Sequence, residues 1–73
     1  MNKVKKISLL NDYYNLVKLN FEHDFVVNEI CKKNNLHNAN KIILENLIKT
    51  NKIIIDNHLK FDRHILVESK LKL

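Results

Sequence analysis

Four histidines and one cysteine are the side chains of this 73-residue chain that could bind a metal most readily. They are His23, Cys31, His37, His58 and His64. Imidazole and thiolate groups hold zinc when they recur at helical spacing or in paired C-x-x-C turns. None of the histidines has a second ligand three or four residues away on an expected helix, and Cys31 has no cysteine partner. We therefore expect no metal site.

Catalytic arrangements are also not expected. No Ser-His-Asp, Cys-His or two-carboxylate arrangement stands out, and the chain has no glycine with which to build a phosphate loop. Cys31 falls on the apolar face of an expected helix, where burial makes a thiol inert. The sequence thus predicts no enzyme, no cofactor and no small-molecule substrate.

The charge balance favours an anionic partner. Thirteen Lys and Arg residues against eight Asp and Glu give a formal net charge of +5, with a pI near 9.5. Such a balance favours nucleic acid first and a membrane surface second. A lysine-rich codon usage would produce the same charge without any function.

Length and composition predict one small domain over residues 1–73. Residues 1–6 are expected as a basic arm, either solvated or lying along phosphates, and residues 63–73 as a tail that forms a short helix, a strand or an extended segment. A single cysteine excludes an internal disulfide, and no apolar run is long enough to cross a bilayer. We expect a cytoplasmic protein, or a nuclear one in a eukaryote, with no membrane partner.

Apolar periodicity predicts three helices. The first covers Ser8 to Asn20, with Ser8 as its N-cap and Tyr13 and Tyr14 on its buried stripe rather than as a stacking surface for bases. Phe21 then fills the core, and Asp24 caps a second helix around residues 26–33. A third, mostly buried helix follows over residues 38–50, with Ala39, Ile43 and Leu47 at helical spacing. The intervening Asn-rich run 34–38 predicts a turn, because Asn tolerates left-handed backbone angles.

The order of these elements resembles the helix-turn-helix of winged-helix domains. The resemblance rests on Glu29-Ile30-Cys31, Leu36, the Leu44 and Leu47 pair, a break at Asn51, and the run Ile53 to Ile55. It implies a mainly α fold of three helices with a two-stranded β-hairpin wing. We accordingly expect strands at 52–56 and 59–62 around an Asn57-His58 turn, with Leu59 and Phe61 facing the core.

In a winged helix that binds DNA, the third helix lies in the major groove and the wing touches the backbone or the minor groove. That geometry implies double-stranded DNA as the partner and a role in transcription regulation, with the protein acting as a dimer because one module makes few contacts. A phage or plasmid regulator would be of this size. The expected DNA-contacting residues are His37, Asn38, Asn40, Lys41, Lys49, Lys52, His58 and Lys60.

Glu45 argues against that hypothesis. It stands four residues from both Lys41 and Lys49, where it would neutralise them and repel phosphates. The alternatives are a protein-interaction module of the same fold, such as a small mobile-element inhibitor of a host nucleic-acid enzyme, and an RNA-binding protein.

Overall fold

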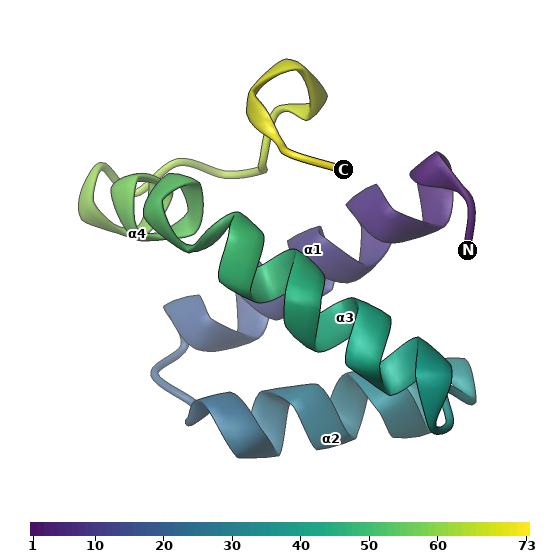
Figure 1. The fold of residues 1–73 in the computed structure, drawn as a ribbon. Coiled ribbons are helices and arrows are strands. Elements are labelled where there is room, and N and C mark those ends of the chain that lie inside the picture. Colours follow the sequence, from purple (N-terminus) through teal and green to yellow (C-terminus); the bar gives the residue numbers. More distant parts are fainter.

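The protein folds as four α-helices and one short 3₁₀ turn, and contains no β-strand. The computed structural model describes all residues 1–73. In chain order the elements are α1 (Lys3–Lys18), α2 (His23–Asn34), α3 (Ala39–Thr50), α4 (Lys52–Lys60) and η1 (Glu68–Lys70). Helix α1 contacts each of α2, α3 and α4, so the other helices are arranged around it (Figure 1). None of the helices has the length and apolar composition needed to cross a bilayer.

Helix α1 begins five residues earlier than its apolar stripe predicts. Its N-cap is Asn2, whose Oδ1 accepts a hydrogen bond from the Lys5 amide at 2.8 Å, and not Ser8. Asn is among the best N-cap residues because its side chain satisfies an amide that the helix leaves free. Most of the expected basic arm is therefore the first turn of a helix.

The turn between α2 and α3 confirms the prediction made from the Asn-rich run. Asn35 has φ 54° and ψ 42°, a left-handed conformation, and the amide of Leu36 bonds back to the Cys31 carbonyl at 2.8 Å. Asn38 also has a positive φ, 47°, and precedes the first residue of α3. Asn is the residue that adopts these angles most readily after glycine, which this chain lacks.

The predicted wing is wrong, and the winged-helix fold class with it. Residues 52–60 form helix α4, in which the Ile55 amide bonds to the Asn51 carbonyl at 2.9 Å and the Phe61 amide to the Asn57 carbonyl at 3.1 Å. The proposed turn residues Asn57 and His58 lie within this helix. The architecture is a bundle of four helices in place of three helices and a hairpin.

Burial explains why the isoleucine run is helical. Ile55 is fully buried whereas Ile53 is 76% exposed, although both would lie on one face of a strand. The buried side chains Ile55 and His58 recur at the three-residue spacing of a helix face. An i, i+4 ion pair of 2.9 Å between Lys52 and Asp56 supports the same helix. A lone two-stranded hairpin, by contrast, is marginally stable.

One core joins all four helices. Tyr13 and Tyr14 are buried, as predicted, and so are Val26, Val27, Ile30 and Cys31 of α2. The full set of buried apolar side chains is Leu9, Leu10, Tyr13, Tyr14, Val26, Val27, Ile30, Cys31, Leu36, Leu44, Leu47, Ile48, Ile55 and Leu66. The core positions predicted for Phe21 and Phe61 are wrong, because both rings are largely exposed.

The segment after α4 lies across the bundle and is held by side chains of other elements. The Tyr14 hydroxyl donates to the Arg63 carbonyl, and Asn11 Oδ1 accepts from the Leu66 amide at 2.8 Å. Buried Asn51 bonds to both the amide and the carbonyl of Lys72, at 2.6 and 2.9 Å. Within this segment Leu66 is buried and η1 is the one helical turn.

Candidate nucleic-acid interface

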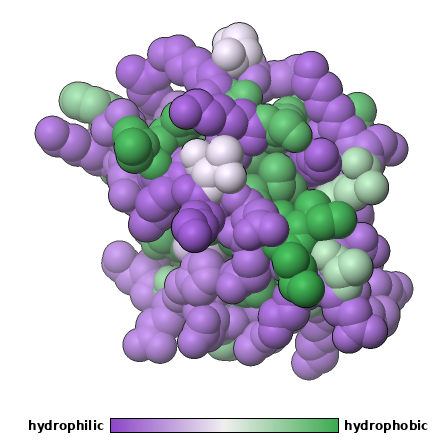
Figure 2. Space-filling view, in the orientation of Figure 1, coloured by the Kyte–Doolittle hydropathy of each residue, from purple (hydrophilic) through white to green (hydrophobic).

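Helix α3 presents one stripe of two apolar and two polar side chains to solvent. Its buried side is formed by Leu44, Leu47 and Ile48. The opposite side is an outward stripe at helical spacing, which consists of Ala39, Ile42, Asn46 and Lys49, all exposed. Ile42 is 61% exposed, and Figure 2 shows hydrophobic atoms over α3 framed by hydrophilic ones. We call these four residues the outward stripe.

The structure gathers four of the predicted DNA-contacting residues at one end of α3. His37, Asn38, Asn40 and Lys41 are all exposed, and they occupy the turn and the first helical turn. Lys49 lies eight residues further along, which corresponds to about 12 Å of helix.

Glu45 lies one helical turn from both Lys41 and Lys49, but its carboxylate contacts His23 and pairs with neither lysine. Its Oε1 lies 3.0 Å from Nε2 of His23, and Nδ1 of the same ring lies 2.8 Å from the Tyr13 hydroxyl. Oε1 of Glu45 and Nε2 of His23 are at ion-pair distance but form no hydrogen bond, so the contact is an ion pair when the imidazole is protonated. The chain Tyr13–His23–Glu45 links α1, α2 and α3 and draws the acid away from the outward stripe.

Lys41 and Lys49 are consequently free of acidic partners. The ion pairs of the protein join Lys3 to Glu68, Lys18 to Asp62, His23 to Glu45 and Lys52 to Asp56. The Lys41 ammonium donates a hydrogen bond to Asn28 Oδ1, at 3.5 Å. Both ammonium groups are therefore available to phosphates.

The remaining predicted residues do not join this surface. Lys52 is paired with Asp56, and that hydrogen bond raises the pKa of Lys52. His58 is 3% exposed, and Lys60 lies at the far end of α4 from Lys52. Because the wing is absent, the backbone or minor-groove contacts expected of these three residues have no structural basis.

Two residues of the candidate interface were not predicted from the sequence. Asn46 and Ile42 lie in the middle of the outward stripe, yet the predicted face was centred on Lys41 and Glu45. The predicted buried side was defined by Ala39, Ile43 and Leu47, whereas the side that is buried carries Leu44, Leu47 and Ile48. The buried side is therefore rotated about the helix axis by roughly the angle between successive residues. Weighting Leu44, Leu47 and Ile48 would have turned the predicted face toward Asn46.

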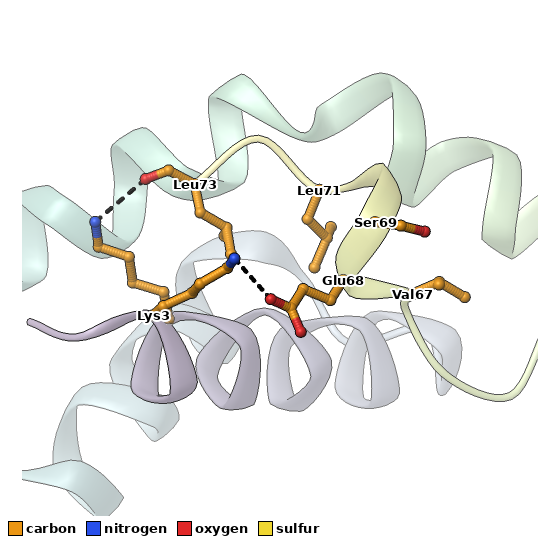
Figure 3. A pocket seen from close by; sticks show the side chains of 7 residues that line it. Lys3, Val67, Glu68, Ser69, Leu71 and Leu73 are labelled. Atoms are coloured by element: carbon orange, nitrogen blue, oxygen red, sulfur yellow. Dashed lines mark hydrogen bonds and ion pairs between the residues drawn. The ribbon is translucent and has the colours of Figure 1, made fainter.

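Other candidate sites carry less chemistry. A hollow of about 770 Å³ lies between the start of α1 and residues 67–73, but its charges are satisfied within the protein (Figure 3). Lys3 pairs with Glu68 at 2.7 Å, and Lys6 Nζ donates to the Leu73 carbonyl at 3.2 Å. No three His, Cys, Asp or Glu side chains lie together as metal ligands do. Burial raises the pKa of the Cys31 thiol, which disfavours the reactive thiolate.

No protein-family model, curated protein or solved structure matches this chain.

Proposed function

We propose that this protein binds double-stranded DNA, with α3 in the major groove. Support comes from two helices joined by the short turn 35–38, of which the second, α3, has an exposed side that carries Asn46 and Lys49. This is the arrangement in which helix-turn-helix proteins place their second helix against base edges. Helix α2 would then lie across the backbone.

The outward stripe has the side-chain types that recognise base pairs. An Asn amide such as that of Asn46 forms two hydrogen bonds with adenine, and an aliphatic group such as that of Ile42 contacts the thymine methyl. Lys49 would bond guanine or a phosphate. Each good base contact contributes about 1–3 kcal/mol of discrimination, so this stripe favours sites rich in A·T pairs.

The observation that carries the proposal is the position of Glu45. With its carboxylate 3.0 Å from His23 Nε2, the acid no longer pairs with Lys41 or Lys49. A protein with a net charge of +5 then offers DNA a surface on α3 whose Lys41 and Lys49 form no ion pair with an acid of the protein.

Regulation of transcription by a dimer is the biological role that fits such a module. A single small DNA-binding module buries about 600–1,000 Å² of its surface, which limits its affinity and specificity. Two copies on neighbouring half-sites would supply the missing contacts.

Fluorescence anisotropy with a random duplex rich in A·T pairs tests the proposal. The wild-type protein should bind at about 50 mM salt and lose orders of magnitude in affinity by about 200 mM, because phosphate contacts release counterions. Lys49→Ala should weaken binding and reduce the salt slope by about one. Asn46→Ala should instead narrow the difference in affinity between A·T-rich and G·C-rich duplexes.

Lys33→Ala is the matched control. It removes the same charge from the groove between α1 and α2, where Asp12 and Glu29 lie nearby, and should change the affinity little. If Lys33→Ala and Lys49→Ala weaken binding equally, α3 is not the interface. Absence of binding even at low salt would remove DNA as the partner.

A protein-interaction module is the second candidate function. The rings of Phe21 and Phe25 stack at 5.1 Å and are nearly half exposed, and Leu19 beside them is also exposed. Exposed apolar groups of this kind mark protein contacts. The same titration separates the two functions, because a protein that docks only through Phe21 and Phe25 shows no salt-dependent binding to duplex DNA.

A further inference from the structure

A second basic site lies at the C-terminal end of α4. It is a hollow of about 340 Å³ lined by Ile54, Asn57, His58, Lys60, Phe61, Arg63 and Lys70. Lys60, Arg63 and Lys70 are all exposed cations, and no acidic residue lines the hollow. We call it the basic hollow.

Neighbouring groups do not neutralise these cations. The adjacent acid, Asp62, pairs with Lys18 at 3.1 Å. The carbonyls of Asn57, His58 and Leu59 at the end of α4, which would attract cations, accept from the amides of Phe61, Arg63 and Asp62. Like charges gathered without a counter-ion repel one another, so an anion entering the hollow would be favoured.

Two of the cations are held in place before any ligand arrives. The Lys60 ammonium lies 5.6 Å and the Arg63 guanidinium 6.0 Å from the centre of the Phe61 ring, within the range of cation–π attraction. The Arg63 amide also bonds to the His58 carbonyl at 3.1 Å, which fixes the backbone that carries the guanidinium. Such preorganisation reduces the entropy lost on binding.

His58 supplies an independent observation. Its Nδ1 lies 3.0 Å from the Ile54 carbonyl, which can only accept, so this nitrogen carries a proton. Its Nε2 is buried and has no hydrogen-bond partner in the protein. His58 also lines the hollow, so this nitrogen is an unpartnered polar atom of a residue at its wall.

We propose that the basic hollow binds a phosphate group, with Arg63, Lys60 and Lys70 around the anion and His58 at its inner wall. The planar guanidinium fork of Arg63 matches two phosphate oxygens, and the lysines add point charges. The phosphate is either free in solution or part of a DNA backbone. The site contains no residue of the outward stripe of α3, so its test is independent of the test of the proposed function.

Titration of the ¹⁵N-labelled wild-type protein with inorganic phosphate, followed by NMR, tests the proposal. We expect saturable shifts confined to the amides of residues 57–63 and Lys70 and to the imidazole nitrogens of His58, at constant ionic strength. The double variant K60Q/R63Q should bind phosphate at least tenfold more weakly. Both residues are exposed, so the variant should keep the wild-type circular dichroism and melting temperature.

The control is the double variant K32Q/K33Q, which removes the same charge from the exposed side of α2. It should change phosphate affinity less than twofold. Equal weakening in the two double variants, or shifts spread over every lysine of the protein, would overturn the proposal, as would the absence of saturation in the millimolar range.

A second experiment, the salt dependence of duplex DNA binding, identifies the source of the phosphate. If the hollow holds a backbone phosphate of bound DNA, K60Q/R63Q should lower the slope of log affinity against log salt for duplex DNA by about one to two. An unchanged slope together with the loss of free phosphate binding assigns the site to a free phosphate or phosphomonoester.

Discussion

Asparagine takes structural positions in this protein that glycine takes in most others. Four residues have positive φ angles, namely Asn20, Asn35, Asn38 and Asp62. In addition, Asn51 is fully buried between α3 and α4, where its Nδ2 donates to the Leu47 carbonyl at 2.8 Å. The same Nδ2 donates to the Lys72 carbonyl, and Oδ1 accepts from the Lys72 amide. A buried amide is tolerated only when it is bonded in this way. Asn51 is thus the residue that ties residues 70–73 to the bundle.

Asn51→Ala should lower the free energy of unfolding by about 2–4 kcal/mol, because it removes three hydrogen bonds and leaves buried partners unsatisfied. Urea denaturation measures the change. Asn15→Ala, at an exposed position of α1, is the control and should change the value by less than about 0.5 kcal/mol. Similar values for the two variants would mean that the contacts of Asn51 do not stabilise the fold.

Helix α4 shows how one apolar run is compatible with two secondary structures. Ile53, Ile54 and Ile55 have β-branched side chains that favour strands, and the run is too short for its period to distinguish strand from helix. Burial of Ile55 and His58 against α1 and α3 favours the helix. The helix also leaves Ile53 in solvent, which a strand would not do while burying Ile55.

Ile55→Ala should therefore cost about 2–5 kcal/mol of stability, as removal of a fully buried aliphatic side chain does. Ile53→Ala should cost less than about 0.5 kcal/mol, because its side chain already contacts water. The two variants together test whether residues 52–60 form a helix. Residues two apart lie on the same face of a strand, so in a half-buried strand both substitutions would lower the stability by similar amounts. Chemical denaturation followed by circular dichroism at 222 nm would supply both values.

At the scale of the whole molecule, α1 joins the parts that are distant in sequence. It contacts the other three helices, and its side chains Asn11 and Tyr14 hold residues 63–66. Buried titratable groups add a dependence on pH. Burial raises the pKa of the Tyr13 hydroxyl, opposed by Lys52, and raises that of the Cys31 thiol, while a hydrogen bond to Asp56 raises the pKa of Lys52.

All three shifts predict that stability falls in alkaline solution. Each group holds its proton more strongly in the folded state than in the unfolded chain. The unfolded chain therefore loses protons first, once the pH exceeds the ordinary pKa values of 9.0 for Cys31, 10.0 for Tyr13 and 10.5 for Lys52. The stabilisation is fully present below those values and is lost as pH rises above them. Urea midpoints should therefore be constant up to a pH of about 8.5 and then decline. Cys31→Ala should remove the earliest part of the decline, and an unchanged profile in this variant would exclude the thiol as its source.

Local chemistry determined the three helices and the turn between α2 and α3, because apolar spacing and left-handed asparagines act over a few residues. The first helix was predicted five residues short because the predicted amphipathic stripe begins at Leu10, whereas the N-cap is the polar Asn2. The anionic partner that the composition favours stays a prediction. These features required no knowledge of how the elements pack.

Only the tertiary structure decided the state of residues 52–60, the partner of Glu45 and the place of His58. Glu45 pairs with His23, which belongs to another helix, and not with the lysines four residues away. The isoleucine run follows the helix because α1 and α3 cover Ile55. Burial and long-range pairing outweigh local preferences of a few tenths of a kcal/mol per residue, and a linear sequence does not state which surfaces meet.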